Sequence, residues 1–469
     1  MPSLEFEKQK TDALSFFGKR VLVMGLGLHG GGLEAVKYLL KNGARVLVTD
    51  KRTEKELRPS IAVLGSFVRK GAYPRIRYVL GHHREKDFSS VDFVLKNAGV
   101  RPDSPYLEKA RKRGTCVISD ITMFFDVCPA PIIGVTGTRG KSTAAYLISE
   151  FLHAGLAKKR VWLGGNIRRS VLEFLPSVRR DDVVVLELSS FQLMDLEESK
   201  KSPQISVMTN IMNDHLNWHR SRREYIRAKS VIFRYQSSKD HLFVNSRDPI
   251  LRRATTSARS RTHFVKIPKA YERLVEEKLG VHYSASVGLA IAVARHFGIR
   301  DRTIKSVLLN FTCLSARQEE IRVWKGIHFV NDTTATIPDA AVAALKRFSV
   351  ISGKRGGEVV LIAGGSDKKL DFRAFIKSAD RFAKAIIFLP GDATLQMKRE
   401  LGRVWSHGPA RADGPHTRDA RSMREAVRFA VRAAAPGDTV LLSPGAASFG
   451  LFVNEFDRGD QFTREVKRL

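Results

Sequence analysis

The chain has 469 residues, which is too long for one ordinary hydrophobic core and indicates two to four domains. With 43% apolar and 27% charged residues, it has the composition of a folded soluble protein. No apolar run of about 18 residues occurs, so a transmembrane helix is not expected, and the first residues lack the apolar segment of a signal peptide. Its three cysteines lie far apart and match neither a disulfide framework nor a zinc pattern, which predicts a cytoplasmic protein.

The net charge of +32 is the most unusual bulk property. A field of this sign attracts anionic substrates and also binds nucleic acid without specificity. The lysines and arginines are nevertheless spread through every segment, without a basic tail or a nucleic-acid motif with interleaved aromatic residues. We therefore expect a generally basic surface and no specific nucleic-acid partner, and nucleic-acid binding stays open as a second class of function.

The first predicted unit is a strand, a glycine-rich turn, a helix and a second strand. The first strand covers Arg20 to Met24, and the turn Gly25-Leu-Gly-Leu-His-Gly30 precedes a helix that runs through Leu40. The second strand, Arg45 to Thr49, ends at Asp50. Three glycines followed by an acid about 20 residues later form a dinucleotide-binding fingerprint. One hypothesis is therefore an NAD-dependent oxidoreductase, although a second phosphate loop downstream argues against it.

That second loop is Gly134-Val-Thr-Gly-Thr-Arg-Gly-Lys-Ser-Thr143, which follows an apolar run and leads into a helix. Glycines let the backbone approach phosphates, and the N–H groups of the first helical turn point at them. Lys141 can reach the β- and γ-phosphates, and the hydroxyl of Ser142 or Thr143 can bind Mg²⁺. Downstream, Glu187 ends a buried strand, where a carboxylate is well placed to bind Mg²⁺.

Apolar runs alternate with helices through the rest of the chain. Near-continuous apolar strands of this kind predict mostly parallel sheets covered by helices. The further expected strands are 91–95, 116–118, 182–188, 205–208, 327–330, 358–363, 385–389 and 439–442. The expected helices include 221–233, 284–297 and an amphipathic stretch up to 309. The sequence therefore predicts an α/β protein of three domains, with bounds 1–128, 129–309 and 310–469.

The spacing of the phosphate loop resembles that of one particular superfamily. Val135 stands where a general P-loop has glycine, and the pattern Gly-x-x-Gly-Thr-x-Gly-Lys-Ser/Thr is similar to that of the Mur ligases and folylpolyglutamate synthases. From Lys19 to Phe462 the motifs follow the order of the Mur ligases, and they are most similar to members that add D-glutamate. The resemblance implies a Rossmann-like N-terminal domain that binds a UDP substrate, a central P-loop ATPase-type parallel sheet, and a Rossmann-like C-terminal domain that binds an amino acid.

The resemblance also implies an ATP site and a metal site. The implied ATP-binding residues are Gly137, Thr138, Gly140, Lys141, Ser142, Thr143, His282, Arg317 and Asp332. The implied ligands of two Mg²⁺ ions are Ser142, Thr143, Glu187, His215 and Lys229. In the family the lysine at the place of Lys229 is carbamylated, which turns a cation into an anionic oxygen ligand. The implied catalytic residues are Lys141, Lys229 and Arg317, with Arg317 stabilising charge on the transferring phosphoryl group.

Two further sets of residues are implied to bind the other substrates. The contacts of the UDP substrate are Leu28, His29, Asp50, Lys51, Arg52, Gly99, Asn166, Ser189 and Gln192. The contacts of the incoming amino acid are Thr336, Lys368, Ser448 and Phe449. Thr334 departs from the family pattern, because it replaces a lysine that contacts D-glutamate. Tyr283 and Ser286 replace two asparagines that contact adenine. A different Mur-type or glutamyl ligase therefore stays open as an alternative.

The implied reaction has two steps and belongs to the synthesis of peptidoglycan precursors. ATP phosphorylates the terminal carboxylate of UDP-N-acetylmuramoyl-L-alanine, which gives an acyl phosphate and ADP. The amine of D-glutamate then attacks the carbonyl carbon, and phosphate leaves. Because water would hydrolyse the acyl phosphate, the site must be shielded, which implies closure of the third domain over the second. We expect a monomer that does not insert into membranes.

Overall fold

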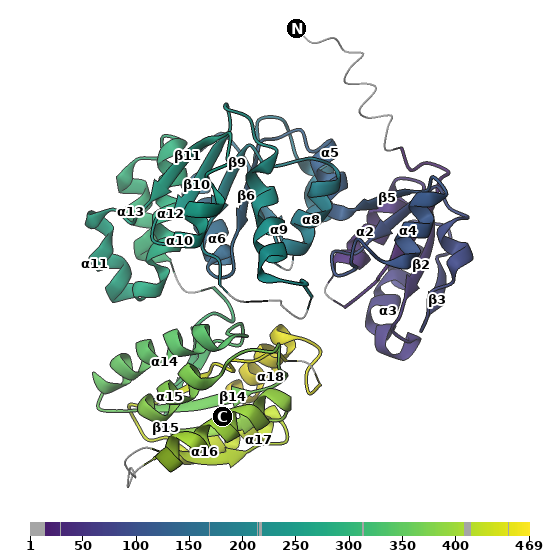
Figure 1. Cartoon of the computed structure of the whole chain (residues 1–469). Helices are drawn as coiled ribbons and strands as arrows, with labels where there is room; N and C mark the ends of the chain where they lie inside the picture. Colours follow the sequence, from purple (N-terminus) through teal and green to yellow (C-terminus); the bar gives the residue numbers. More distant parts are fainter. Residues whose placement is uncertain are drawn as a thin grey trace. The chain divides into compact units, whose positions relative to one another are not determined.

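The computed structural model describes residues 15–28, 30–167, 169–212, 214, 218–311, 314–407, 414–448 and 450–469. The chain contains three α/β sheets with their helices (Figure 1). They fold into two compact units. The first unit comprises residues 1–212, 222–275 and 283–309, and the second comprises 213–221, 276–282 and 310–469.

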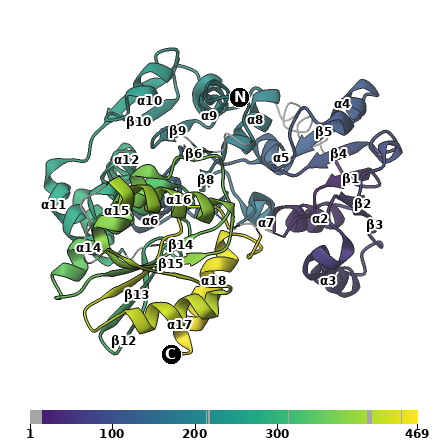
Figure 2. The ribbon, with the colours of Figure 1, turned by 60° about the horizontal axis from the view of Figure 1, so that its bottom comes forward.

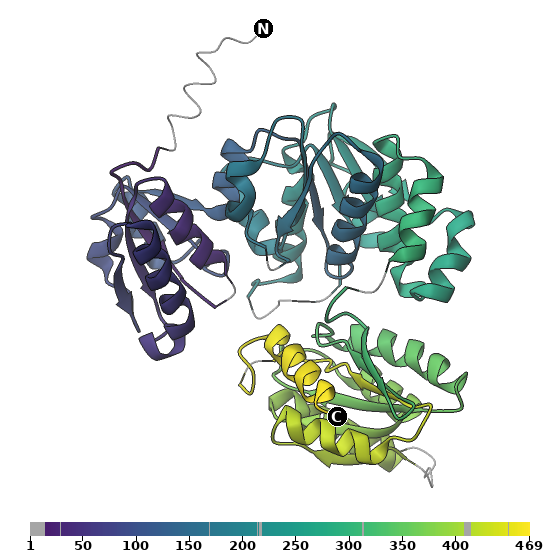
Figure 3. The ribbon, with the colours of Figure 1, turned by 180° about the vertical axis from the view of Figure 1, so that it is seen from behind.

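The first sheet has five parallel strands in the order β3-β2-β1-β4-β5. Its strands are β1 (Arg20–Met24), β2 (Arg45–Asp50), β3 (Arg77–Leu80), β4 (Phe93–Lys96) and β5 (Cys116–Ser119). Its helices are α2 (Gly31–Lys41), α3 (Glu54–Gly71), η1 (Glu85–Phe88), α4 (Pro105–Lys112) and α5 (Asp120–Val127), drawn in purple and blue in Figure 3. The strand order reverses between β1 and β4, and ligands of such sheets bind beyond the carboxyl ends of the strands at this point.

The second sheet has six parallel strands in the order β11-β10-β9-β6-β8-β7. Its strands are β6 (Ile132–Thr136), β7 (Val161–Gly165), β8 (Val183–Glu187), β9 (Ile205–Met208), β10 (His241–Asn245) and β11 (Arg261–Val265). The helices of this part are α6 (Lys141–Gly155), α7 (Val171–Phe174), η2 (Leu175–Ser177), α8 (Ser190–Glu198), α9 (Arg222–Arg234), α10 (Pro249–Ala254), α11 (Lys269–Lys278), η3 (Val281–Tyr283), α12 (Ser284–His296) and α13 (Asp301–Asn310). Helix α6 packs against α12, and α8 packs against α9. Every residue of β6 and β8 is buried, which explains why both strands are apolar runs.

The third sheet has six strands in the order β12-β13-β17-β14-β15-β16, of which β12 alone is antiparallel to its neighbour. Its strands are β12 (Glu319–Trp324), β13 (Ile327–Asn331), β14 (Val359–Gly364), β15 (Ala383–Leu389), β16 (His416–Asp419) and β17 (Thr439–Leu442). Its helices are α14 (Pro338–Gly353), α15 (Arg373–Phe382), α16 (Asp392–His407), α17 (Met423–Ala433) and α18 (Glu455–Lys467). Helices α14, α15 and α16 contribute to one core and α17 and α18 to another, so both faces of the sheet are covered (Figure 2).

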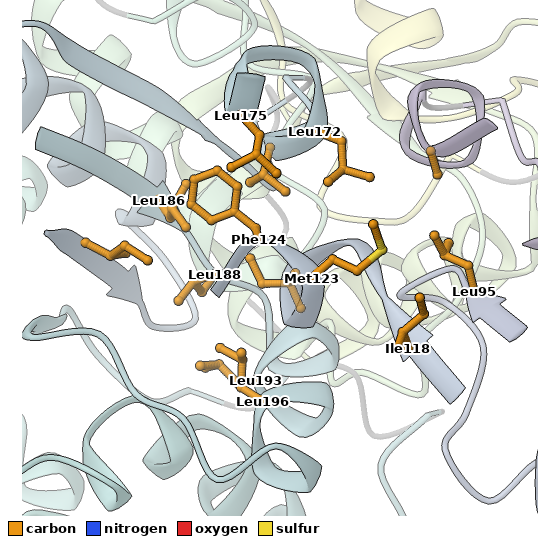
Figure 4. Packing of buried hydrophobic residues seen from close by; sticks show 14 of the residues in the cluster. Leu95, Ile118, Met123, Phe124, Leu172, Leu175, Leu186, Leu188, Leu193 and Leu196 are labelled. Atoms are coloured by element: carbon orange, nitrogen blue, oxygen red, sulfur yellow. The ribbon is translucent and has the colours of Figure 1, made fainter. Parts of the chain in front are cut away.

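The first two sheets share a hydrophobic core around α5 (Figure 4). Met123 and Phe124 of this helix are at most 1% exposed. The Phe124 ring meets the Phe174 ring edge-on, with 5.6 Å between centroids. The same cluster contains Leu95 of the first sheet and Leu186 of the second. The two sheets are therefore parts of one packed unit.

The predicted α/β fold class is confirmed. The strands at 20–24, 205–208 and 439–442 have the predicted bounds. The strand predicted at 91–95 runs from Phe93 to Lys96. Asp92 still bonds to β1, because its backbone N–H donates to Arg20 O at 2.9 Å and its side chain accepts a 2.7 Å hydrogen bond from Arg20 N. No helix within the described ranges is long and apolar enough to cross a membrane.

Candidate active site

The loop between β6 and α6 is a tight turn with glycine at two critical positions. Gly137 and Gly140 have φ of 148° and 78°, conformations that residues with a Cβ rarely adopt. A Cβ on Gly137 would lie 1.9 Å from Thr209 Oγ1, and one on Gly140 would lie 2.2 Å from Ser286 Oγ. The loop therefore closes against its neighbours in a way that requires glycine at both positions.

Residues directly after β9 hold this loop in place. Asn210 Oδ1 accepts a 2.8 Å hydrogen bond from Arg139 N, and Asn210 Nδ2 donates to Arg139 O at 3.0 Å. The Tyr225 hydroxyl lies 3.1 Å from Thr138 Oγ1. Lys141 Nζ donates to Thr138 O at 2.9 Å, so its side chain folds back along the loop. The backbone N–H groups at the start of α6 follow directly, in the arrangement that binds phosphate groups.

A carboxylate meets the first turn of α6. Glu187 is the last residue of β8 and is 2% exposed. Its Oε2 accepts a 2.5 Å hydrogen bond from the Ser142 hydroxyl, and its Oε1 accepts one from Asn166 Nδ2 at 3.1 Å. Strands β6 and β8 are neighbours, so their carboxyl ends bring these side chains together. Two residues predicted as Mg²⁺ ligands are therefore in direct contact.

Lys229 reaches the same loop from α9. Its side chain is 2% exposed, and Nζ donates to Gly137 O at 2.9 Å and lies 3.5 Å from Thr136 Oγ1. The amine also lies 4.8 Å from the centroid of the Tyr225 ring. The predicted catalytic lysine is thus buried against the phosphate loop.

The oxygen atoms here are of the kind that Mg²⁺ prefers. The hydroxyls of Ser142 and Thr143 and the carboxylate of Glu187 are hard ligands, and Mg²⁺ in such sites usually also binds phosphate oxygens and water. Within the described residues, no cluster of three or more His, Cys, Asp or Glu side chains could hold a metal ion. His215, a further predicted ligand, lies outside the described residues. The donor set fits an ion that a bound phosphate helps to hold.

Loops after β1, β2 and β4 carry the predicted UDP residues of the first sheet. Asp50 Oδ2 accepts a 3.1 Å hydrogen bond from a backbone N–H of the glycine turn, and Oδ1 accepts one from Arg52 N at 2.9 Å. Asn97 Nδ2 donates to a carbonyl of the glycine turn at 3.3 Å, which joins the loops after β1 and β4. His29 lies outside the described residues. The described members of this predicted set on the first sheet are Leu28, Asp50, Lys51, Arg52 and Gly99.

Two predicted substrate contacts in the middle sheet have a local structural role. Ser189 precedes α8, and its Oγ accepts a 3.2 Å hydrogen bond from Gln192 N, while Gln192 Oε1 accepts one from Ser189 N at 3.1 Å. This reciprocal pair is a capping box, which satisfies N–H groups at the start of a helix. The Ser-x-x-Gln spacing is the sequence signal for it.

Arg317 lies between two residues with left-handed backbone. Ala316 and Gln318 have φ of 63° and 54°, which is uncommon for residues with a Cβ. The Thr334 hydroxyl donates to Ala316 O at 3.0 Å. Strained backbone collects at functional sites and persists where its surroundings hold it. The Thr334 hydroxyl thus fixes the segment that contains Arg317.

Asp332, Thr336 and Lys368 lie on loops at the carboxyl edge of the third sheet. Asp332 follows β13, and its Oδ2 accepts a 2.8 Å hydrogen bond from the Ser443 hydroxyl. Lys368 Nζ lies 3.4 Å from Thr336 Oγ1 and 3.4 Å from Oδ1 of Asp214, which belongs to the same unit. Two of the predicted amino-acid contacts are therefore neighbours.

Ser448 lies on the loop after β17. Ala447 exchanges two backbone hydrogen bonds with Ser366, at 2.9 and 3.1 Å, so this loop is joined to the one that carries Lys368. Ser448 is 3% exposed, and its hydroxyl has no hydrogen-bond partner among the described residues. Because buried polar groups normally have a partner, the hydroxyl fits a ligand contact. Phe449 lies outside the described residues.

The predicted ATP-binding residue His282 and the nearby Ser286 belong to different units. His282 belongs to the second unit, where burial and the charge of Arg347 lower the pKa of its imidazole to about 4 and a hydrogen bond with Gln318 opposes the shift. Ser286 belongs to the first unit, and its hydroxyl donates to Gly140 O at 3.2 Å. Ser286 thus contacts the phosphate loop.

The sequence does not single out Arg458, one of the largest fully buried side chains. Its Nε donates to Thr333 Oγ1 at 3.0 Å, and its Nη1 donates to Ala446 O at 3.1 Å. Burial lowers the pKa of Arg458 to about 10. The guanidinium thus joins the loop that carries Thr336 to the loop that carries Ser448. In an arginine-rich chain, no local pattern separates such a residue from surface arginines.

Comparison with known proteins gives matches along nearly the whole chain. The model of the Mur ligase MurD-like N-terminal domain matches residues 19–119, that of the Mur ligase middle domain matches 135–297, and that of the Mur ligase glutamate ligase domain matches 316–445. The three models follow the predicted order of the three sheets.

Full-length relatives and solved structures agree with these matches. The UDP-N-acetylmuramoylalanine--D-glutamate ligase of Roseiflexus sp. (strain RS-1) is 37% identical and covers 96% of this chain and 98% of its own length. The protein of the same name from Borreliella afzelii (strain PKo) is 36% identical and covers 96% and 97%. A pseudomurein peptide ligase type C from Methanothermus fervidus shares the fold, with a TM-score of 0.53 and 16% identity, and covers 96% of this chain and 100% of its own. The predicted resemblance is confirmed, and the chain belongs to the Mur ligase family.

Proposed function

We propose that this protein joins D-glutamate to UDP-N-acetylmuramoyl-L-alanine in an ATP-dependent reaction. The observation that carries the proposal is the contact between Ser142 and Glu187, 2.5 Å apart, at the end of a glycine loop that also receives the Lys229 amine. Relatives with 37% and 36% identity over nearly the full chain bear the name of this activity, which supports the choice of substrates.

In the first step, an oxygen of the substrate's terminal carboxylate attacks the γ-phosphorus of ATP. The bond from that phosphorus to the β–γ bridging oxygen breaks, so that ADP and an acyl phosphate form. The Lys141 ammonium and the N–H groups at the start of α6 stabilise charge on the phosphoryl oxygens. We assign Arg317 the same task from the second unit, because a strained segment presents it.

Mg²⁺ held by Ser142, Thr143, Glu187 and His215 would neutralise phosphate charge at this point. We further propose that Lys229 is carbamylated: its neutral amine bonds the carbon of CO₂ and loses a proton, which leaves an anionic oxygen ligand. Its burial against Gly137 supports this role. After incubation with ¹³C-bicarbonate, a carbamate NMR signal is expected from the wild type and not from Lys229→Arg. A signal of equal intensity from both would contradict the assignment.

In the second step, the amine of D-glutamate forms a bond to the acyl carbon. Phosphate leaves with the electrons of the broken C–O bond, and the amine releases a proton to solvent. We assign the binding of D-glutamate to Thr336, Lys368, Ser448 and Phe449, with the Lys368 ammonium facing its carboxylates. The 3.4 Å separation of Lys368 Nζ from Thr336 Oγ1 and the buried Ser448 hydroxyl support this assignment.

We assign the UDP group to the loops of the first sheet. The competing hypothesis, an NAD-dependent oxidoreductase, needs Asp50 to bind a ribose hydroxyl. Both oxygens of that carboxylate already accept backbone hydrogen bonds, which favours a structural role for Asp50. Absence of NAD-induced fluorescence change is the expected result, and NAD binding by the first sheet would revive the alternative.

Phosphate release with ATP, Mg²⁺ and UDP-N-acetylmuramoyl-L-alanine tests the proposal. D-Glutamate is compared with L-glutamate, L-lysine, diaminopimelate and glycine. We expect release with D-glutamate and a product heavier by one glutamyl unit. Release with another amino acid alone would keep the mechanism and change the specificity, which would point to Thr334. Absence of release with all five would overturn the proposed function.

A further inference from the structure

A buried ion pair joins the first sheet to a helix of the second. Lys96 is the last residue of β4, and its Nζ lies 2.5 Å from Oδ1 of Asp195 on α8. Both side chains are 2% exposed. The predicted reaction does not use either residue. A charged pair inside a packed junction therefore calls for an explanation of its own.

The same ammonium closes the loop that follows β4. Lys96 Nζ donates to Val100 O at 3.1 Å, and Asn97 Oδ1 accepts a 3.3 Å hydrogen bond from Gly99 N. Asn97 also donates to the carbonyl of Gly25 in the glycine turn. The 97–100 loop is therefore fixed to β1 on one side and, through Lys96, to α8 on the other.

Stability alone does not account for this arrangement. Removing two charges from water is costly, and apolar residues of similar volume in place of a buried pair are often neutral or stabilising. Burial raises the pKa of Asp195 to about 6 although Lys96 opposes the shift, and burial also raises the pKa of the neighbouring Asp120. Two desolvated carboxyl groups around one lysine are thus held at an energetic cost. What the pair supplies is a defined geometry.

We propose that Lys96 and Asp195 are positioning residues that set the 97–100 loop against α8. This inference rests on the proposed function, in which Gly99 belongs to the loops that bind the UDP group of the substrate. The acyl end of that substrate must reach the phosphate loop of the middle sheet. Fixing the loop to α8 sets the distance between the part of the site that binds the UDP group and the part where the acyl group reacts.

Apolar replacement tests the positioning role. The double variant Lys96→Met/Asp195→Leu keeps a packed junction but loses the hydrogen bond to Val100 O, and Lys96→Met alone is the second variant. We expect the KM for UDP-N-acetylmuramoyl-L-alanine to rise about tenfold in both variants. Each variant loses the charged hydrogen bond that holds the loop in position. The KM for ATP and the kcat at saturation should stay within about twofold of wild type.

An exposed ion pair between the same two sheets provides the control. Arg111 of α4 lies 2.9 Å from Glu198 of α8, with exposed fractions of 34% and 43%. Glu198→Gln should leave every KM unchanged. A wild-type KM for the UDP substrate in the folded double variant, or an equal rise in the KM for ATP, would overturn the positioning role.

Calorimetry separates this inference from the proposed function. If wild-type protein binds the UDP substrate but releases no phosphate with any amino acid, the proposed function fails and the affinity of the double variant still decides the positioning role. Weaker binding than wild type supports that role, and equal binding overturns it. If the wild type does not bind the UDP substrate at all, both the proposed function and the positioning role are overturned.

Discussion

The phosphate loop of the second sheet and the amino-acid loops of the third differ in how completely their polar groups are bonded. At the phosphate loop, Glu187 accepts two hydrogen bonds and the Lys229 amine donates to a loop carbonyl at 2.9 Å. At the amino-acid loops, Lys368 approaches its two neighbours at 3.4 Å, and in the described part of the chain the Ser448 hydroxyl has no partner. The first region is organised by the protein itself, and the second leaves hydrogen-bonding capacity for a ligand.

This difference matches the two tasks of a ligase. Stabilising a phosphoryl group requires charges and dipoles that are in place before the reaction. Choosing one amino acid requires polar groups that stay unsatisfied when the wrong ligand binds, because an unpaired buried group is costly. We infer that the phosphate loop supplies rate and that the loops of the third sheet supply specificity.

Lys141→Ala is the change with the largest expected effect. It removes the ammonium next to the phosphate loop, and loss of one such stabilising group lowers kcat by a factor on the order of 10² to 10³. Phosphate release under saturating substrates measures it. Lys158→Ala, at an exposed position beyond the end of α6, is the control and should be as active as wild type. Near-normal turnover in Lys141→Ala would contradict an active role for this loop.

A pH titration probes the second unit through His282. Because burial lowers the pKa of this imidazole to about 4, the folded state binds fewer protons than the unfolded state, whose pKa is near 6.5. This contribution to stability is complete above pH 6.5 and decreases as the pH falls towards 4, and solvent screening reduces the loss because the His282 side chain is exposed. Thermal melting of wild type and His282→Gln at pH 7.5 and 4.5 measures the difference. Equal losses in the two proteins would show that His282 does not carry this cost.

Ser142→Ala should destabilise the protein even without ligands. It removes the hydroxyl that donates to Glu187 and leaves a buried carboxylate oxygen short of a donor, at a cost of about 1–3 kcal/mol. A lower melting temperature of the unliganded protein is the expected result. Ser378→Ala is the control, because that exposed hydroxyl donates only to the carbonyl of the preceding helical turn among its described contacts.

Ser448→Ala should not destabilise the unliganded protein, in contrast to Ser142→Ala. Because its hydroxyl has no hydrogen-bond partner among the described residues, the unliganded protein loses no bond and should melt at the wild-type temperature or slightly above. The KM for D-glutamate should rise about tenfold, the equivalent of about 1.4 kcal/mol. The KM for ATP should not change. A clear drop in the melting temperature would mean that this hydroxyl is structural and would remove the contrast between the two regions.

Two fully buried strands were predicted with the observed bounds, whereas the edge strands β11 and β16 were not predicted. The strands at 205–208 and 439–442 are fully buried, and apolar residues occupy every position except Ser206 and Thr439. Strand β16, His416–Asp419, is exposed at each position and carries polar residues throughout. Only its ladder with β15 makes it a strand, and a ladder partner leaves no mark in the local sequence. Strand β11, at an edge of the second sheet, also has no fully buried residue and is a strand through its ladder with β10.

The proximity of residues in the candidate site was predictable where they belong to one contiguous motif or follow a buried strand. Lys141, Ser142 and Glu187 meet these conditions. Their contacts with residues such as Asn210 depend on which strands are neighbours in the sheet, and that order is set by packing rather than by position in the chain. Arg458 illustrates the same limit, because its partners lie more than a hundred residues away or on another loop.

The core around α5 limits how the chain can be cut into fragments that fold on their own. A fragment that ended at residue 128 would expose the side chains of Met123 and Phe124, each worth about 1.5–3 kcal/mol when buried. Such a fragment should aggregate, and the first two sheets should melt in a single cooperative transition. For crystallisation or inhibitor screening, the smallest useful piece therefore runs through Leu309, although family models divide it in two.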